Sequence, residues 1–135
     1  MDLEKAMVTA ASGMRSQSAR MRLIAENIAN ANSTSNRPGE DPYRRKVLTF
    51  AEAVDRESQA QVVEVGKVSL DQTPFREKYD PGNPAADGRG YVKLPNVNAL
   101  IEMIDMKEAQ RSYEANLTSI ETAKHMISRT VDLLR

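Results

Sequence analysis

The sequence of 135 residues contains no cysteine and no tryptophan, and aromatic residues make up only 4% of it. Without cysteine the chain has no disulfide, no thiolate metal site and no cysteine nucleophile. Its 19 basic and 19 acidic side chains cancel, and no block of five or six like charges occurs, so the basic patch typical of nucleic-acid binding is missing. No apolar run of about eighteen residues occurs, and no membrane-spanning helix is predicted.

Proline and methionine divide the chain into three parts. All six prolines lie between Pro38 and Pro95, and all seven methionines lie outside that window. We therefore expect an N-terminal helix in residues 1–32, an extended and β-hairpin insert with Pro/Gly-rich turns in 33–95, and a C-terminal helix in 96–135. The first residues are acidic where a signal peptide would be basic, so a cleaved signal peptide is not expected.

Both terminal segments carry apolar side chains at the spacing of a helix that packs along another helix. In the first segment the stripe consists of Leu3, Met7, Ala10, Met14, Gln17, Met21, Ile24, Ile28 and Ala31. In the last segment it consists of Met106, Tyr113, Ile120, Ile127 and Leu134, widened by Leu117 and Val131 on one side and by Ala109 and Ala123 on the other. Asp2 is a suitable cap for the first helix, and Asn96 or Asn98 for the second.

An ordinary amphipathic helix in a small bundle would explain either stripe alone. Two such stripes at opposite ends favour a terminal coiled coil. The predicted fold is therefore mainly α, with long N- and C-terminal helices packed as an antiparallel coiled coil and a small extended or β-hairpin insert between them. The small side chain of Ala10 and the polar one of Gln17 reduce the apolar area of the first stripe. We therefore expect the helices to need several neighbours and to be largely disordered until they assemble.

The middle segment has the composition of short strands and turns. Residues 43–50 and 61–70 are enriched in Val, Leu and aromatic residues and are predicted to pair as a hairpin across the polar stretch 52–60. Residues 79–84 and 87–90 contain the proline and glycine of tight turns. We expect this part to run extended over a surface.

Catalytic and ligand-binding motifs are absent from the sequence. Asp80, Asn83 and Asp87 fit no register of a calcium loop, and a plain turn explains them. His125 is the only histidine, lies in a predicted helix and has no cysteine to help it hold zinc. Neither a phosphate-binding loop nor a Gly-x-Ser-x-Gly nucleophile elbow occurs. We therefore predict no enzyme, no cofactor and no metal site.

Several motifs resemble those of bacterial flagellar axial proteins. Residues 27–32, Asn-Ile-Ala-Asn-Ala-Asn, follow a helix with Ser-Gly-Met at 12–14, as in the N-terminal signature of flagellar rod and hook proteins. More narrowly, residues 42–46, 79–87, 90–98 and 111–116 look like the flagellar basal-body rod protein C family (FlgC). The motif residues in the insert are Tyr43, Arg44, Tyr79, Pro81, Gly82, Asn83, Pro84, Gly90, Tyr91, Pro95 and Asn96.

The resemblance implies a structural subunit of the proximal rod of the flagellar basal body, which assembles helically through its terminal helices and transmits torque. It also implies export through the flagellar type III apparatus without a cleaved signal, and a place in the periplasmic rod. The implied partners are copies of the chain, proximal rod proteins of the B and F types, the distal G type, the rod-base adaptor and the export apparatus. A soluble coiled-coil adaptor of a type III secretion apparatus is the alternative.

Carried onto this sequence, the resemblance places assembly contacts in the two stripes. Asn27, Asn30 and Asn32 would order the exit from the first helix, and residues 79–98 would be the extended segment that leads back to the second helix. Arg111, Tyr113 and Asn116 would face the first helix or neighbouring subunits.

Overall fold

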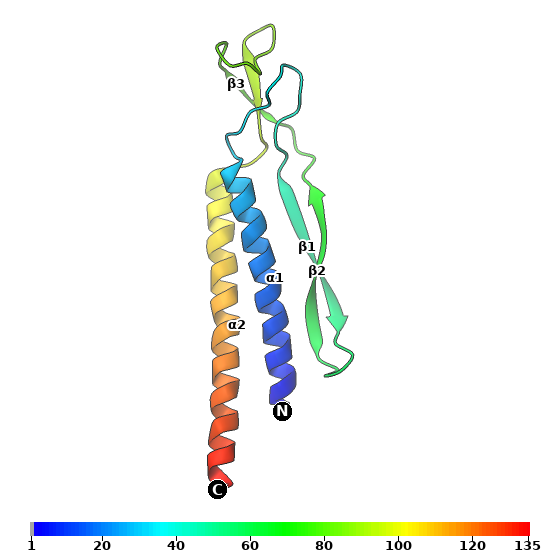
Figure 1. Cartoon of the computed structure of the whole chain (residues 1–135), viewed down its shortest axis with the longest axis vertical. Coiled ribbons are helices and arrows are strands. Elements are labelled where there is room, and N and C mark those ends of the chain that lie inside the picture. Colours follow the sequence, from blue (N-terminus) through cyan, green and yellow to red (C-terminus); the bar gives the residue numbers. More distant parts are fainter. Residues whose placement is uncertain (1) are drawn as a thin grey trace. The chain divides into compact units, whose positions relative to one another are not determined.

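Residues 2–135, which the computed structural model describes, form two helices and four strands (Figure 1). Helix α1 covers Leu3–Ala29 and helix α2 covers Ala99–Leu133. Between them lie β1 (Lys46–Val54), β2 (Gln61–Leu70), β3 (Arg76–Tyr79) and β4 (Tyr91–Leu94). Strand β1 pairs with β2, and β3 pairs with β4, so the described residues contain two separate two-stranded sheets.

The predicted fold class is wrong. The described chain is 46% helical and 20% strand, and it is not a pair of long helices in an antiparallel coiled coil with a small hairpin insert. The buried residues of α2 are Glu102, Ala109 and Ala123, whereas the apolar stripe residues Ile127 and Val131 are exposed. The seven-residue repeat shows which side chains share a face of a helix, but it does not show whether the same chain covers that face.

Both helices begin at the caps that the sequence predicts. The Asp2 carboxylate accepts hydrogen bonds from the backbone N–H groups of Glu4 and Lys5, at 3.2 and 3.4 Å. Of the two asparagines considered for α2, Asn98 is the cap, and its Oδ1 accepts from the N–H groups of Leu100 and Ile101 at 3.1 and 3.4 Å. These side chains satisfy donors that the first turn of a helix leaves free.

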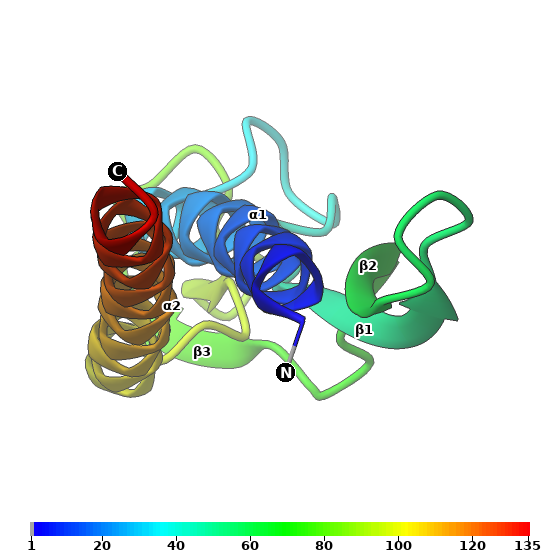
Figure 2. The ribbon, with the colours of Figure 1, turned by 90° about the horizontal axis from the view of Figure 1, so that it is seen from below.

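The chain divides into two compact units. The first contains residues 2–21, 49–67 and 107–135, and in it α1 lies between α2 and the β1–β2 pair (Figure 2). Hydroxyl groups of α1 bind the backbone of β2. Thr9 and Ser16 donate to the carbonyl oxygens of Gln61 and Val63, at 2.8 and 3.2 Å, and Ser12 Oγ accepts from the Val63 N–H at 3.1 Å. These hydroxyl groups bind N–H and carbonyl groups on the edge of β2 that could otherwise pair with a third strand.

On its other side in the same unit, α1 contacts α2 through small or polar residues. A Cβ atom added to Gly13 would lie 2.7 Å from Asn116 Nδ2. Ala109 and Ala123 of α2 are buried. Small side chains allow the two backbones to approach closely, so this helix pair needs no wide apolar seam.

The second unit contains residues 22–48 and 68–106, including the β3–β4 hairpin. Arg76 pairs with Leu94 and Tyr79 with Tyr91, whose rings meet edge to face at 5.3 Å. Arg76 also donates hydrogen bonds to the carbonyl oxygens of Pro95 and Ala31, at 3.1 and 3.0 Å. The arginine therefore ties the hairpin to the segment just beyond the end of α1.

The insert contains more regular structure than the sequence predicts. Strands β1 and β2 lie in the predicted hairpin segments, although β1 begins at Lys46 and continues to Val54, into the stretch expected to be the polar connection. The β3–β4 hairpin lies where an extended segment with turns is expected. Its strands have only 4 residues each, the shortest length over which an alternation can be read, and the sequence Arg-Glu-Lys-Tyr of β3 has no alternation of apolar and polar residues. The division of the chain at residues 32 and 95 remains a prediction.

Gly90→Ala is expected to destabilise the β3–β4 hairpin by about 1–3 kcal/mol. Gly90 has a φ of +85°, and an added Cβ would lie 2.9 Å from the Tyr79 ring. Gly88→Ala is the matched control, because an added Cβ there meets nothing within 4 Å. Urea unfolding monitored by circular dichroism measures the difference between the variants. Equal effects at the two glycines would contradict this account of the turn.

Candidate assembly surface

In the second unit, the first turns of α2 carry an apolar surface that the chain leaves uncovered. Leu100, Ile101, Met103 and Ile104 are between 51% and 68% exposed. Glu102, in the middle of this segment, is 1% exposed. At 3.6 residues per turn, Glu102 lies on the side of the helix opposite to these four residues. The usual amphipathic arrangement is thus reversed, with the charge inside and the apolar side chains outside.

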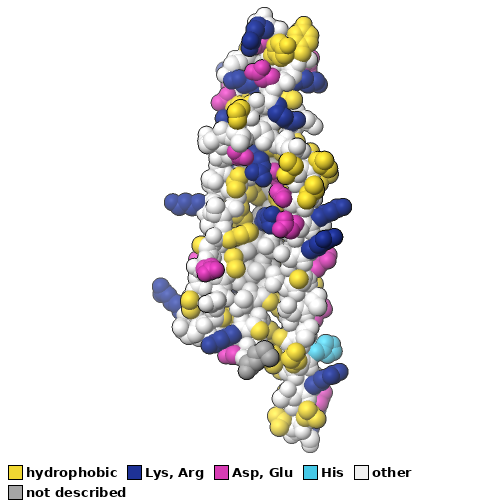
Figure 3. Space-filling view, turned by 180° about the vertical axis from the view of Figure 1, so that it is seen from behind, with side chains coloured by type: hydrophobic (Ala, Val, Ile, Leu, Met, Phe, Trp, Pro, Cys, Tyr) yellow, Lys and Arg dark blue, Asp and Glu magenta, His cyan; other side chains and the backbone are white. Residues whose placement is uncertain are grey.

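In the first unit, α2 carries a further set of exposed apolar side chains. This set consists of Leu117, Met126, Ile127, Val131 and Leu133, and the exposed Leu134 follows directly after the end of the helix. Figure 3 shows hydrophobic side chains at the surface, interspersed with charged ones. Single exposed apolar residues are normal, but a series along one helix is typical of a surface that another protein covers.

The stripe of α1 is more covered than that of α2. Ala10, Ile24 and Ala31 are buried, and the other apolar members are half-buried, namely Leu3, Met7, Met14, Met21 and Ile28. Gln17, the polar member, is also half-buried, and its Oε1 has no hydrogen-bond partner among residues 2–135. The predicted residues of the last segment differ more in exposure. Met106, Tyr113, Asn116 and Ile120 are half-buried, whereas the exposed ones are Arg111, Leu117, Ile127, Val131 and Leu134. Their role in assembly stays a prediction.

Asn27 is the best connected of the three asparagines in the N-terminal motif. It is buried, and its side chain binds both backbone groups of Lys46, accepting from the N–H at 3.0 Å and donating to the carbonyl at 2.9 Å. Its Oδ1 also accepts a hydrogen bond from the Tyr43 hydroxyl at 2.7 Å. Asn30 is half-buried and donates to the Glu26 carbonyl at 2.8 Å, whereas Asn32 is exposed. Asn27 therefore fixes the start of β1 against α1.

Arg45 joins this arrangement to the start of α2. Its guanidinium Nε donates to Glu102 Oε1, and its Nη1 lies 3.4 Å from Asp71 Oδ2. Asn27 Nδ2 donates to the other oxygen of Glu102 at 3.4 Å. The carboxylate of Glu102 thus has a partner on each oxygen. A buried charge needs such pairing, because the unpaired charge would lose its hydration without compensation.

Asn96, another predicted motif residue, completes the cluster from the segment before α2. Its Oδ1 accepts from the Arg45 N–H at 2.8 Å, and its Nδ2 donates to the carbonyl oxygens of Asp71 and Thr73 at 3.0 and 3.1 Å. Arg44 binds the same Asp71 carbonyl at 3.0 Å, and its guanidinium lies 4.2 Å from the centre of the Phe75 ring. We call Asn27, Tyr43, Arg45, Asp71, Asn96 and Glu102 the polar cluster.

The charges of the polar cluster shift the ionisation of its members. Burial raises the pKa of Tyr43 to about 12, and the carboxylates of Glu26 and Glu102 add to that effect. Burial alone would lower the pKa of Arg45, but its hydrogen bond and ion pair with Glu102, supported by Asp71, raise it. A hydrogen bond from the Thr73 N–H, together with Arg45, lowers the pKa of Asp71. The cluster therefore keeps Arg45 and Asp71 charged and Tyr43 neutral.

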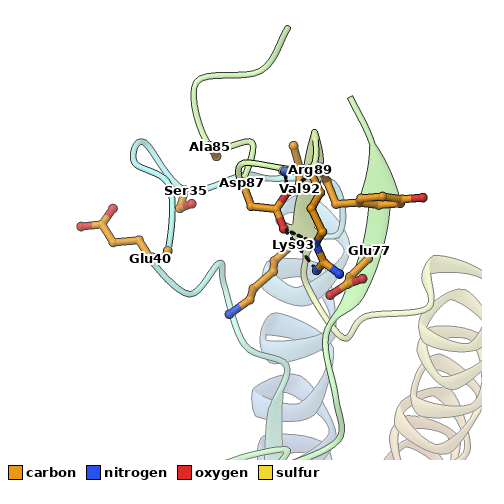
Figure 4. A pocket seen from close by; sticks show the side chains of 10 residues that line it. Ser35, Glu40, Glu77, Ala85, Asp87, Arg89, Val92 and Lys93 are labelled. Atoms are coloured by element: carbon orange, nitrogen blue, oxygen red, sulfur yellow. Dashed lines mark hydrogen bonds and ion pairs between the residues drawn. The ribbon is translucent and has the colours of Figure 1, made fainter. Parts of the chain in front are cut away.

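The turn between β3 and β4 contains most of the remaining insert motif. The exposed residues of this turn are Tyr79, Pro81, Gly82 and Pro84. The Asn83 N–H donates a hydrogen bond to the Asp80 carbonyl at 3.1 Å and so stabilises the turn. Figure 4 shows a polar pocket beside this turn, where Asp87 and Arg89 face each other at 3.3 Å. Backbone N–H groups of Tyr91 and Arg89 lower the pKa of Asp87. Because each oxygen of the carboxylate already accepts a hydrogen bond from a group of the turn, we assign it a structural role.

Other kinds of site find no support in the described part of the chain. Residues 2–135 contain no group of three His, Cys, Asp or Glu side chains placed to hold a metal ion. None of the helices in this range is long and apolar enough to cross a membrane. Sequence reasoning missed Arg76, Asp71 and Glu102. Arg45 lies within a quoted motif, but no signal indicates that Glu102 is buried rather than exposed in the first turn of a helix.

Tyr43→Phe is expected to lower the free energy of unfolding by about 1 kcal/mol at neutral pH, because it removes the hydrogen bond that the Tyr43 hydroxyl donates to Asn27 Oδ1. It is also expected to remove part of the alkaline loss of stability. Folding raises the pKa of Tyr43 from 10.0 to about 12, so the unfolded chain loses the phenol proton at a lower pH than the folded chain. The stability that this difference provides is complete below pH 10 and is lost as the pH rises towards 12. Urea unfolding at several pH values measures both effects. An alkaline slope identical to that of the parent chain would contradict the prediction, and Tyr91→Phe is the control.

Comparisons with known proteins agree on one family. The family model described as flagellar basal body rod FlgEFG protein C-terminal matches residues 89–133. The flagellar basal-body rod protein FlgC of Agrobacterium fabrum is 52% identical over 133 residues, which cover 98% of this chain and 96% of the relative. The FlgC protein of Escherichia coli O6:H1 is 40% identical over 92% of each chain. That of Borreliella burgdorferi is 37% identical and covers 100% of this chain and 99% of the relative. The chain therefore belongs to the flagellar basal-body rod protein FlgC family.

Proposed function

We propose that the chain is a structural subunit of the rod of the bacterial flagellar basal body. The observation that supports this most strongly is its similarity to FlgC proteins over nearly the whole length of both chains. The exposed apolar residues of α2 fit this role, because a subunit of a tube needs surfaces that its neighbours cover. No catalytic role is proposed.

Our finer proposal is that the subunit lies in the proximal rod and assembles helically through its terminal helices. Each arriving subunit would bury the stripes of α1 and α2 among its neighbours, and the resulting tube would transmit torque. The proposed neighbours are copies of the chain, the B- and F-type proximal rod proteins, the distal G type and the rod-base adaptor. The proposed route is the flagellar export apparatus, without cleavage of a signal peptide, into the periplasmic rod.

Isolated basal bodies provide the test of this function. A gene that encodes the chain with a small epitope tag replaces the endogenous gene. Basal bodies are then purified and separated from the membrane fraction. We expect the tagged chain to copurify with the rod, and we expect the deletion strain to contain no complete rods. Complete rods in the deletion strain, or a chain that occurs only as a soluble small oligomer, would contradict the proposal.

A further inference from the structure

In the second unit, the first turns of α2 expose their apolar side chains and bury a charged one. Four apolar side chains, Leu100, Ile101, Met103 and Ile104, face outward, and the glutamate between them faces inward. The hydrophobic effect by itself favours the opposite rotation, which would bury part of the apolar set and return the carboxylate to water. Some specific interaction must therefore hold this helix end in the observed rotation.

The contacts of Glu102 supply that interaction. Arg45 Nε donates to one carboxylate oxygen, and Asn27 Nδ2 donates to the other at 3.4 Å. Arg45 is in turn held by Asp71 at 3.4 Å and lies 4.0 Å from Asp105, one turn further along α2. All these residues belong to the second unit. If α2 rotated, Arg45 would lose Glu102, and a half-buried guanidinium would keep only one near carboxylate.

We propose that Glu102 and Arg45 are positioning residues that fix the rotation of the first turns of α2, so that Leu100, Ile101, Met103 and Ile104 face outward. A buried ion pair contributes little net stability. Its two groups can contact each other in only one rotation of the helix, however, and any other rotation would leave a charge without its partner. The inference deepens the proposed function and rests on it only for the use of the outward face, which rod neighbours would cover.

The natural absence of cysteine makes the orientation measurable in the purified chain. Ile101→Cys places a single thiol on the outward face, and Val97→Cys places one at a position that is 1% exposed in the same unit. The rate of reaction with a maleimide reports the exposure of each thiol. In the parent background we expect Cys introduced at 101 to react at least about tenfold faster than Cys introduced at 97, since burial protects a group until the structure opens. Equal rates at the two positions would overturn the proposal.

The decisive variant is the double substitution Arg45→Met with Glu102→Met, made in the Ile101→Cys background. Replacing a buried ion pair by apolar side chains of similar volume often leaves stability unchanged or raises it, so this variant is expected to fold. We expect the thiol at position 101 to react about tenfold more slowly than in the parent, because burying the side of the helix that carries positions 100, 101, 103 and 104 then stabilises the chain more than burying the single apolar side chain introduced at position 102. If the pair served only stability, the thiol would stay as reactive as in the parent, and that result would overturn the proposal.

Two single variants serve as controls on the same reporter. Glu102→Gln keeps an oxygen that can accept from Arg45, and we expect it to preserve the fast reaction of the thiol at position 101. Glu114→Leu adds an apolar side chain at an exposed position of α2 and is expected to leave the rate unchanged. A rate lowered equally by Glu114→Leu would attribute the effect to added hydrophobicity and overturn the role of the pair.

Incorporation into basal bodies separates this inference from the proposed function. The folded double variant is expected to fail to enter the rod, whereas Glu102→Gln is expected to enter it. A double variant with an unchanged thiol rate and normal incorporation would overturn the inference and leave the rod assignment intact. Rods that form without the chain would contradict the proposed function, but the conclusion on the rotation of α2, which rests on the thiol rates, would still hold.

Discussion

Arg45→Met alone is expected to lower the free energy of unfolding by about 3–5 kcal/mol, because it leaves the carboxylate of Glu102 buried with one weak partner. This is a large part of the roughly 5–15 kcal/mol that holds a typical domain folded. Urea unfolding of the purified chain, followed by circular dichroism, measures the loss. The cost is that of breaking the pair, so adding Glu102→Met to the variant is expected to recover most of it.

Arg89→Met is the matched control for this prediction. Arg89 also pairs with a carboxylate, that of Asp87 at 3.3 Å, but its side chain is 75% exposed. Exposed pairs contribute about 0–1 kcal/mol, so little change is expected. Similar losses in the two variants would show that the burial of Glu102 does not determine the energetics of the polar cluster.

Val131→Asp is expected to abolish incorporation into the rod while leaving the circular dichroism spectrum of the isolated chain unchanged. Val131 belongs to the predicted assembly stripe and is 53% exposed, so the substitution is expected to change the stability of the chain by about 0.5 kcal/mol or less. In an interface that excludes water, the same unpaired carboxylate costs several kcal/mol. The measurement compares the amount of each variant in purified basal bodies, and swimming motility serves as a second readout.

His125→Asp introduces the same charge at an exposed position on the side of α2 opposite to the stripe, because two residues before Ile127 correspond to a rotation of about 200°. We expect it to enter the rod and support motility. Normal rods with Val131→Asp would show that this part of α2 does not contact neighbours. Loss of both variants would indicate a general intolerance of negative charge at this end of the helix instead of a specific apolar contact.

The sequence alone predicts the elements whose determinants are local. Asp2 and Asn98 cap the helices because a side-chain oxygen needs only its own backbone neighbours to do so. The paired segments of β1 and β2 are recognisable because they are long and rich in Val and Leu. The motifs at Asn27, Tyr43 and Asn96 identify residues that the structure then brings together in the polar cluster.

What the sequence could not provide depends on contacts between distant segments. Glu102 is at a position where an exposed acidic residue would stabilise a helix, and only the arrival of Arg45 and Asn27 from elsewhere in the chain explains its burial. The coiled-coil prediction failed for a related reason. The apolar repeat of α2 is real, but α2 buries Ala109 and Ala123 and leaves Ile127 and Val131 exposed. Periodicity cannot distinguish a face that covers the core from one left for a partner.

The central claim is that this chain is a rod subunit whose α2 presents apolar side chains for neighbours to cover. A density map of intact basal bodies by electron cryomicroscopy tests it most directly. The account predicts that the chain fits the rod density, with Leu100, Ile104 and Val131 each within contact distance of a neighbouring subunit. A map that places the chain outside the rod, or that leaves these three side chains in solvent, would contradict the account.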